Sequence, residues 1–261
     1  MSEKHSDKKA MILAAGLGTR LGPVTRDTPK ALVDFHGFAL LEIVIRRLIQ
    51  AGFDDMVVNV HHYADSIRRY LEEKENFGIH ISLSEEQPQP LETGGAVKFA
   101  LPMLEKAEGI LVHNVDVLTD LPLDDFFNMA MKENIPAVLS VRERKATRYL
   151  LADERMLLCG WEDPRSGKRK VVRKPEGEIK RYGFSGIQVI RKRAFNMMPV
   201  KNIFSLTEFY LNLARNDRVK LVPYLQGFWY DIGKPVTLRR AEKKITPDIL
   251  SRLTGKQYSR K

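Results

Sequence analysis

Short apolar runs alternate with amphipathic stretches along the first half of the chain. The apolar runs predict strands, and the stretches with apolar residues at helical spacing predict helices. We expect strands at 10–15, 55–60, 78–84 and 109–117, and helices at 41–52, 64–74 and 93–106. Repeated strand–helix units favour a parallel, doubly wound sheet with helices on both faces. Ligands of such sheets bind at the carboxyl ends of the strands.

The pattern changes after an apolar strand at 135–141. Two short patterned stretches, 148–153 and 156–163, predict a hairpin, and the polar run 164–170 predicts an exposed loop. A strand at 183–190, a helix at 205–216 opened by a capping serine, and a strand at 219–225 follow. We therefore expect an α/β fold with a small antiparallel insertion. One domain at 9–245 would lie between a polar tail, 1–8, and a basic C-terminal helical segment, 236–261.

The composition is that of a soluble globular protein, with 261 residues, 43% of them hydrophobic and 29% charged. No apolar run is long enough for a membrane helix, and the polar N-terminus does not resemble a signal peptide, so we expect a cytoplasmic protein without membrane partners. Cys159 is the single cysteine. This excludes an internal disulfide framework and a thiolate metal cluster, and favours a packing role for that residue.

The formal net charge is +10, and it is distributed unevenly. Between Arg142 and Arg193 there are 16 basic residues against 7 acidic ones, and between Arg239 and Lys261 there are 8 against 2. Nucleic acid or an anionic small substrate would both suit basic surfaces. Few aromatic residues lie among the basic ones to stack on bases, so we favour the small substrate and consider nucleic acid unlikely.

The loop after the first strand carries the main chemical signal. It runs from Leu13 to Leu32 and contains three glycines, Arg20 and a Pro-Lys pair. No Gly-Lys-Ser/Thr follows the glycines, which excludes a P-loop, and the third glycine of a dinucleotide fingerprint is replaced by Leu21. Small residues that expose backbone N–H groups, together with Arg20 and Lys30, predict a triphosphate site.

Two parts of this loop resemble the signature of the sugar-1-phosphate nucleotidyltransferases: Gly16-Leu-Gly18-Thr19-Arg20-Leu21 and Pro29-Lys30. Further similar segments follow in the order of that family, at 58–65, 91–102, 113–120, 183–190 and 229–235. The chain looks closest to the short N-acetylmuramate-1-phosphate uridylyltransferases and to related mannose- or heptose-1-phosphate enzymes. The resemblance implies a Rossmann-like, three-layer (α-β-α) mixed sheet of the nucleotide-diphospho-sugar transferase type. It also implies a nucleotide-binding half at 9–141 and a sugar-phosphate-binding half at 142–235.

The resemblance implies that a sugar 1-phosphate attacks the α-phosphorus of a nucleoside triphosphate and displaces pyrophosphate. Catalysis of such a step is chiefly positioning and charge neutralisation. Arg20 would hold the leaving pyrophosphate, and Lys30 would bridge the α-phosphate and the attacking phosphate. The residues that would bind the nucleotide are Leu13, Ala14, Ala15, Gly16, Gly18, Thr19, Gly94 and Gly95.

Asp116 and Asp231 match the metal ligands of the family and would hold Mg²⁺, which prefers carboxylate, phosphate and water oxygens. Val115 stands where the family more often has glycine, and Asp120 is a weaker alternative ligand. Gly186, Glu92 and Lys174 are the residues expected near the acceptor sugar phosphate.

Several alternatives stay open. UTP is favoured from the branch resemblance, with GTP and CTP as competitors, and the sugar is not specified. A non-catalytic nucleotide or sugar-phosphate sensor and a nucleic-acid-binding module are the competing classes. The basic C-terminal segment is a candidate interface for a homo-oligomer. His61 and His62 are adjacent at a strand end and should point in opposite directions, which favours structural or substrate-rim roles over a metal site.

Overall fold

The computed structural model describes residues 8–16, 18, 21–22, 28–104 and 106–256. These residues form two compact units, and each unit is built from segments that are far apart in the sequence. Unit 1 comprises Met1–Pro90, His113–Asp124 and Phe228–Lys261, and unit 2 comprises Leu91–Val112 and Asp125–Gly227. The nucleotide-binding half at 9–141 and the sugar-phosphate-binding half at 142–235 were expected on the basis of the ligand that each part would bind. That division stays a prediction.

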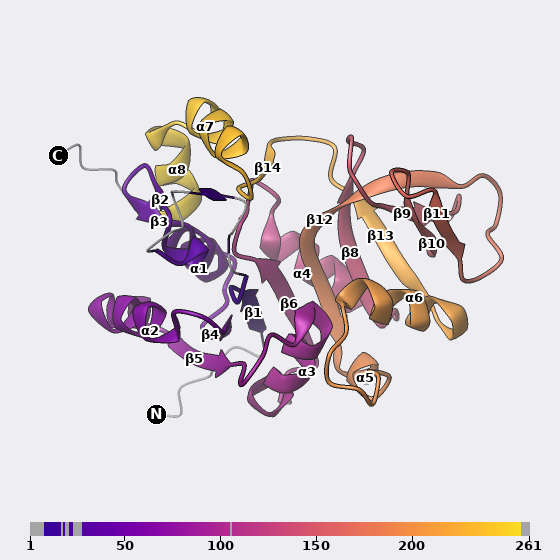
Figure 1. Ribbon diagram of the computed structural model, residues 1–261, viewed down its shortest axis with the longest axis horizontal. Coiled ribbons are helices and arrows are strands. Elements are labelled where there is room, and N and C mark those ends of the chain that lie inside the picture. Colours follow the sequence, from indigo (N-terminus) through magenta and orange to yellow (C-terminus); the bar gives the residue numbers. More distant parts are fainter. Residues whose placement is uncertain (1–7, 17, 19–20, 23–27, 105, 257–261) are drawn as a thin grey trace. The chain divides into compact units, whose positions relative to one another are not determined.

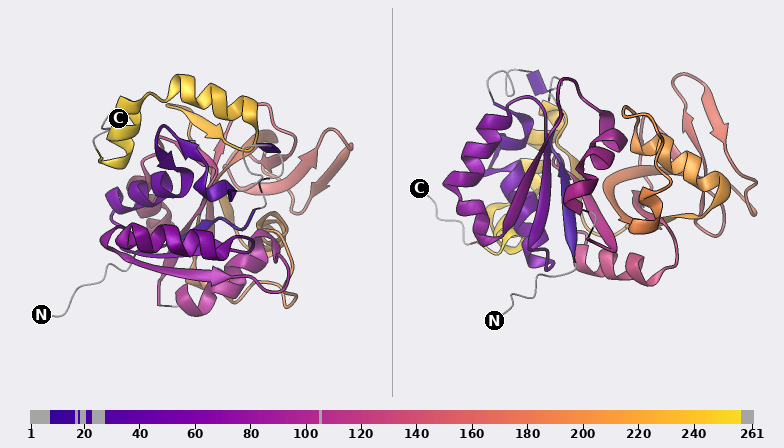
Figure 2. Two further views of the ribbon diagram at one scale, coloured as in Figure 1. Left: turned by 60° about the vertical axis from the view of Figure 1, so that its left-hand side comes forward. Right: turned by 90° about the horizontal axis from the view of Figure 1, so that it is seen from below.

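Unit 1 contains a parallel sheet of β1 (Lys9–Leu13), β4 (Asp55–Val60) and β5 (His80–Glu85). Its crossover helices are α1 (Leu40–Gln50) and α2 (Ala64–Glu73). In Figure 1 these strands lie side by side with α1 and α2 beside them, and the right-hand view of Figure 2 shows the same strands from below. The strands and helices predicted here are present, with ends shifted by one or two residues.

The rest of unit 1 consists of short strands, short turns and the two C-terminal helices. A short hairpin pairs β2 (Asp34–Phe35) with β3 (Phe38–Ala39), and a second ladder pairs β7 (Val117–Thr119) with β14 (Trp229–Asp231). Short 3-10 turns are η2 (Lys30–Leu32) and η3 (Glu75–Gly78). The basic C-terminal segment forms two helices, α7 (Pro235–Lys244) and α8 (Pro247–Thr254). Both helices contribute residues to one apolar cluster with α1 and β7, and this cluster fixes the chain on each side of the β7–β14 ladder. The cluster consists of Leu21, Val33, Phe35, Phe38, Leu40, Ile43, Leu118, Ile232, Leu238, Ala241, Ile245 and Leu250.

Unit 2 is built on the long strand β12 (Lys180–Arg191). It pairs antiparallel with β8 (Ala137–Arg142) and with β9 (Tyr149–Ala152), and β13 (Val219–Pro223) runs parallel to β8. The sheet continues from β9 to β10 (Leu158–Asp163) and β11 (Lys168–Val171). The expected antiparallel hairpin is therefore present, but residues 168–170 belong to an edge strand and the prediction of a loop there is wrong. Every residue of β11 is exposed, so the strand has no apolar alternation by which to recognise it.

The helices of unit 2 are α3 (Glu92–Leu104), α4 (Leu123–Lys132), α5 (Lys192–Phe195) and α6 (Leu206–Asn216). The Ser205 hydroxyl accepts a hydrogen bond from the Glu208 N–H, which confirms the predicted cap of α6. Helix α4 was not predicted. The predicted strand 109–117 is also interrupted: β6 (Gly109–Asn114) ends in a turn at Val115 and Asp116 before β7 begins.

Candidate active site

The carboxyl end of β1 lies beside the ends of its neighbours in unit 1. Leu13 is paired with Asn59 of β4, and the Ala14 N–H donates to the Asn59 carbonyl at 3.0 Å. The Val115 N–H donates to the Leu13 carbonyl at 3.1 Å, which fixes the turn after β6 next to β1. The start of the glycine loop, expected to hold a nucleotide, and the turn that carries Asp116, expected to hold a metal, therefore meet at one edge of the sheet in unit 1, where ligands of parallel sheets bind.

The glycine loop leaves β1 with an open side. Among the described residues, apart from its chain neighbours, none has a heavy atom within 4 Å of a Cβ atom added to Gly16. Gly18 has a φ of 66°, and its carbonyl accepts from the Leu21 N–H at 2.8 Å. A positive φ of this size is readily adopted by glycine, which explains that residue at that turn. Thr19 and Arg20, the other predicted residues of the loop, lie outside the described residues.

Lys30 and Asp116 form an ion pair in unit 1, although 86 positions separate them in the chain. Lys30 follows Pro29 at the start of η2, and only 8% of its surface is exposed. The Lys30 Nζ donates to the Asp116 Oδ2. Burying a lysine is costly unless it is paired, so this contact supplies the structural reason for the position of the Lys30 amine.

Asp231 lies next to Asp116 across the β7–β14 ladder. Asp231 is paired with Val117, and the Ile232 N–H donates to the Asp116 carbonyl at 2.8 Å. Both carboxylates are half-buried. Asp120, the weaker alternative, accepts a hydrogen bond at its Oδ1 from the Phe228 N–H at 2.9 Å, at the start of the segment that leads into β14.

The carboxylates of Asp116 and Asp231 are a suitable donor set for a divalent cation that also binds phosphate oxygens. Mg²⁺ typically takes one or two carboxylates from a protein and completes its octahedron with phosphate and water. Among the described residues, no group of three or more His, Cys, Asp or Glu side chains could hold a metal ion. The hard carboxylate oxygens of Asp116 and Asp231 fit a cation that also binds the phosphate oxygens of a substrate.

His113 is a residue of this region that the sequence did not single out. It lies at the end of β6, is fully buried, and its Nδ1 is 2.8 Å from the Asn114 carbonyl oxygen. Burial, reinforced by the positive charge of Arg47, lowers the pKa of His113 to about 3. Its imidazole is therefore neutral at physiological pH. A histidine within an apolar strand gives no sign of its burial in the sequence.

Gly94 and Gly95, at the start of α3 in unit 2, are crowded by the chain itself. An added Cβ would lie 2.4 Å from the Phe204 ring at Gly94 and 2.0 Å from the Asn202 carbonyl oxygen at Gly95. Both N–H groups donate to the Phe204 carbonyl, at 2.9 and 3.1 Å. These glycines allow the segment before α6 to approach α3 closely, a packing role that the sequence did not suggest.

The three residues predicted for the acceptor all belong to unit 2. Gly186 is buried on β12 where the pairing with β8 changes register, and its φ of 78° favours glycine there. Glu92 is exposed at the start of α3 with a φ of 58°. Lys174 is exposed, and its carbonyl accepts from the Arg173 guanidinium at 3.1 Å.

Arg173 holds the segment that carries Lys174. Its guanidinium donates to the buried Asp153 carboxylate at 2.5 Å and to the Leu158 carbonyl at 3.0 Å. Burial opposes ionisation of Asp153, but hydrogen bonds led by Arg173 prevail and lower its pKa.

The expectation that the side chains of His61 and His62 point in opposite directions is wrong, because their ring centroids are 4.2 Å apart. His61 also contacts the Glu86 carbonyl oxygen through Nδ1, at 2.8 Å.

Comparison with known proteins places the chain in a family. Residues 9–248 match a family model described as "Nucleotidyl transferase". The chain belongs to this family. The resemblance noted from the glycine loop and the Pro-Lys pair is thereby confirmed, and the chain is an enzyme of the nucleotidyltransferase class.

Individual relatives of this nucleotidyltransferase fall into several branches. It is 33% identical over 247 residues to the N-acetylmuramate alpha-1-phosphate uridylyltransferase of Caulobacter vibrioides, which covers 92% of this chain and 98% of that relative. It is 30% identical over 232 residues to the mannose-1-phosphate guanyltransferase beta-A of Xenopus laevis. That match covers 87% of this chain but only 61% of the longer relative.

Solved structures confirm the α/β fold class. The nucleotidyltransferase has a TM-score of 0.71 with HddC from Yersinia pseudotuberculosis, crystallised with GMP-PN, at 24% identity, with 91% of this chain and 99% of that chain covered. The inositol-1-phosphate CTP transferase from T. maritima gives a TM-score of 0.72 at 18% identity, covering 94% and 95% of the two chains. Within the described residues, no helix is long and apolar enough to cross a membrane.

Proposed function

We propose that this nucleotidyltransferase transfers a nucleotidyl group from a nucleoside triphosphate to a sugar 1-phosphate. A phosphate oxygen of the sugar 1-phosphate forms a bond to the α-phosphorus, the bond from the α-phosphorus to the bridging oxygen breaks, and pyrophosphate leaves. The products are a nucleoside diphosphate sugar and pyrophosphate. The observation that carries the proposal is the buried Lys30 amine paired with Asp116 beside Asp231, at the edge where β1 ends.

Lys30 acts on the reacting phosphates in this proposal. Its amine is held by Asp116 before any substrate arrives, so little reorganisation is needed when negative charge develops on the α-phosphate. The open side of Gly16 leaves room for phosphate oxygens to approach the backbone that follows β1. The roles of Arg20 on the leaving pyrophosphate and of Thr19 in the loop rest on the family resemblance.

We assign the metal as Mg²⁺, held by Asp116 and Asp231. When bound, the ion supplies positive charge that neutralises phosphate oxygens and orients them for displacement. Asp116 then has two functions, since its Oδ2 also accepts the hydrogen bond from Lys30. Gly94 and Gly95 were expected to contact the nucleotide, but we propose instead that they act by packing against Phe204 and Asn202. Gly186, Glu92 and Lys174 stay in the proposal as contacts of the acceptor.

UTP is the donor that we favour. The relative with the uridylyltransferase name aligns over nearly its whole length and over nearly the whole of this chain, whereas the guanyltransferase relative extends well beyond the alignment. GTP and CTP are the competing donors, since a guanyltransferase and a CTP transferase are both among the similar proteins.

The test is an assay of pyrophosphate release with Mg²⁺, each of the four triphosphates, and a panel of sugar 1-phosphates. We expect turnover with at least one pair, the highest kcat/KM with UTP, and loss of activity with EDTA that Mg²⁺ restores. A higher kcat/KM with GTP or CTP would reassign the donor only. Binding of a triphosphate without turnover of any pair would instead favour the sensor.

A further inference from the structure

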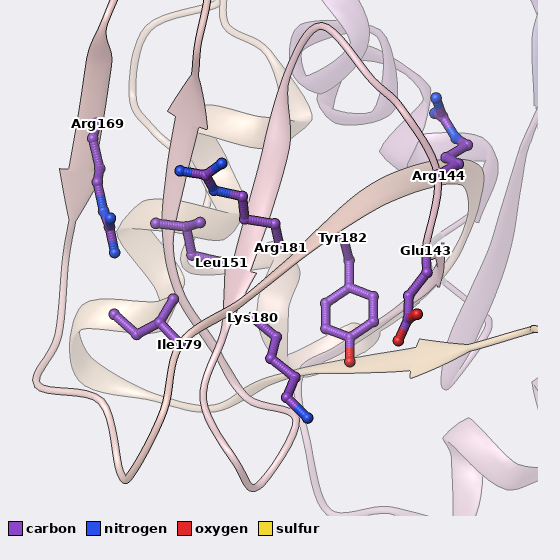
Figure 3. Close-up of a pocket in the computed structure, with 8 residues that line it drawn as sticks. All are labelled: Glu143, Arg144, Leu151, Arg169, Ile179, Lys180, Arg181 and Tyr182. Atoms are coloured by element: carbon purple, nitrogen blue, oxygen red, sulfur yellow. The ribbon is translucent and has the colours of Figure 1, made fainter.

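A pocket of about 660 Å³ lies in the antiparallel sheet of unit 2 (Figure 3). Its size is within the range of small-molecule sites, about 300–1,000 Å³. None of its lining residues is among those assigned above to the nucleotide, the metal or the acceptor. They are Glu143, Arg144, Leu151, Arg169, Ile179, Lys180, Arg181 and Tyr182.

The lining of the pocket is strongly cationic, with four basic side chains against one carboxylate. Arg181 is partly neutralised, because its guanidinium donates to Glu162 at 2.7 Å. Arg169 and Lys180 form no hydrogen bond or ion pair through their side chains in the part of the chain that the structure describes. Uncompensated cations in a concave site favour binding of an anion.

The sheet brings the cations together from three separate segments. Arg181 of β12 is paired with Leu151 of β9, and Arg169 of β11 is paired with Glu162 of β10. Directly paired residues point to the same face of an antiparallel sheet, and Arg181 contacts Glu162, so Arg181, Glu162 and Arg169 share one face. Figure 3 shows Lys180 and Tyr182 extending to the other side of β12 from Arg181.

Gly183 allows Arg144 to lie against β12. A Cβ atom at that position would be 2.8 Å from the Arg144 Nε and 2.9 Å from its Cζ. The Arg144 Nη2 in turn donates to the Phe184 carbonyl at 2.8 Å. The guanidinium is therefore held in place by the backbone of the strand, which reduces the entropy lost when an anion binds to it.

We propose that this pocket binds the phosphate group of a small phosphorylated metabolite. Arg144, Arg169 and Arg181 supply the charge on one face, Lys180 adds charge from the other side of β12, and the partly exposed Ile179 contacts the rest of the molecule. Nucleic acid suits the pocket less well, because its one aromatic side chain, Tyr182, is only 4% exposed and offers no stacking surface. The proposal does not depend on the proposed reaction.

The probe is glucose 6-phosphate, which carries a phosphate but lacks the 1-phosphate that the reaction needs. We expect isothermal titration calorimetry to detect its binding to the full-length protein. The variant Arg169→Gln/Lys180→Gln should bind it about tenfold more weakly or worse. The matched control is Lys168→Gln/Lys170→Gln, which removes the same charge from the exposed strand β11 at positions that alternate away from Arg169. The control should bind like the wild type.

A second arm identifies the source of the phosphate. The KM for the acceptor sugar 1-phosphate is measured for both variants. A selective rise of about tenfold in the Arg169→Gln/Lys180→Gln protein would mean that the acceptor itself occupies the pocket. An unchanged KM with selective loss of glucose 6-phosphate binding would mean that a second molecule does. Unchanged values in both arms, or equal losses in the control, would overturn the proposal. If no pair of triphosphate and sugar 1-phosphate turns over, the calorimetric comparison of the two variants still tests whether the pocket binds glucose 6-phosphate.

Discussion

Two glycine-bearing segments of the molecule are both predicted from the sequence to contact the nucleotide, but their surroundings are opposite. No described residue other than its chain neighbours lies within 4 Å of a Cβ built on Gly16, after β1 in unit 1. Gly94 and Gly95, at the start of α3 in unit 2, face Phe204 and Asn202 of the same chain. A glycine is required wherever something approaches the backbone closely, and that something is either a ligand or another part of the protein. Surroundings, and not the residue type, distinguish a binding glycine from a packing glycine.

The largest loss of turnover is expected from substitution of Lys30 and Asp116, the charged residues at the site that contains the Gly16 segment. We predict that Lys30→Ala and Asp116→Ala each reduce turnover at least about a hundredfold, because each removes a preorganised charge near the reacting phosphates. Steady-state pyrophosphate release measures the loss, and circular dichroism checks that the variants fold.

A matched control for these variants is Lys9→Ala. Lys9 is paired with Asp55 at 2.7 Å in the same unit, and both side chains are largely buried. Because this pair lies at the start of β1 and not at its end, turnover should stay near that of the wild type. Similar losses in Lys9→Ala and Lys30→Ala would mean that both act only through the fold, and would remove the assigned role of Lys30.

The crowded segment should respond to substitution in stability rather than in binding. Gly95→Ala would place a Cβ 2.0 Å from the Asn202 carbonyl oxygen, a backbone atom that cannot rotate away. We predict a loss of about 1–3 kcal/mol in the free energy of unfolding, the usual cost of overpacking. Thermal unfolding would show a fall of about 2–4 °C for each kcal/mol. A raised KM for the triphosphate with an unchanged Tm would instead make this a binding glycine.

Because His113 is buried in unit 1, its protonation should make the free energy of unfolding depend on pH. Its pKa is about 3 in the folded protein and about 6.5 when unfolded, so the unfolded chain binds the extra proton between these values. The contribution of His113 is fully present above about pH 6.5 and is lost progressively as the pH falls towards 3. We predict a loss of up to about 1.4 kcal/mol per pH unit, about 2 kcal/mol between pH 6.5 and 5.

Urea unfolding at pH 7.5 and at pH 5 tests this expectation. The wild type should be less stable at pH 5, and His113→Gln, which has no proton to gain in this range, should lose clearly less. Equal losses in the two proteins would show that other groups carry the pH dependence and that His113 is not held in its neutral form.

Elements specified by local sequence were predicted well. Strand β4 matches the expected residues 55–60, and α6 begins after the capping Ser205, because periodicity and capping are local properties. The turn at Val115 and Asp116 was missed because an apolar run conceals it, and the edge strand β11 because its lysines and arginine give no alternation.

The residues of the candidate site could be named from the sequence, but the contacts between them could not. Lys30, Asp116 and Asp231 were all named, yet the ion pair between the first two joins positions 86 residues apart and exists only in the fold. The same is true of His113, whose neutral state follows from burial and from Arg47. Tertiary contacts of this kind leave no spacing in the sequence from which they could be inferred.

The smallest expected effect is that of Gly16→Ala, and this variant tests most directly whether the triphosphate binds beside Gly16. Gly16→Ala adds a methyl group where none of the described residues beyond its chain neighbours has a heavy atom within 4 Å, and the φ of Gly16 is not in the positive range that disfavours alanine. We therefore predict an unchanged Tm. If the triphosphate approaches the backbone on this side, its KM should rise about tenfold, about 1.4 kcal/mol of binding free energy. Measured beside Gly95→Ala, the two variants should show opposite changes, Tm in one and KM in the other. An unchanged KM in Gly16→Ala would mean that the substrate does not use the open side of this glycine, and the cradle would then have to lie elsewhere in the loop.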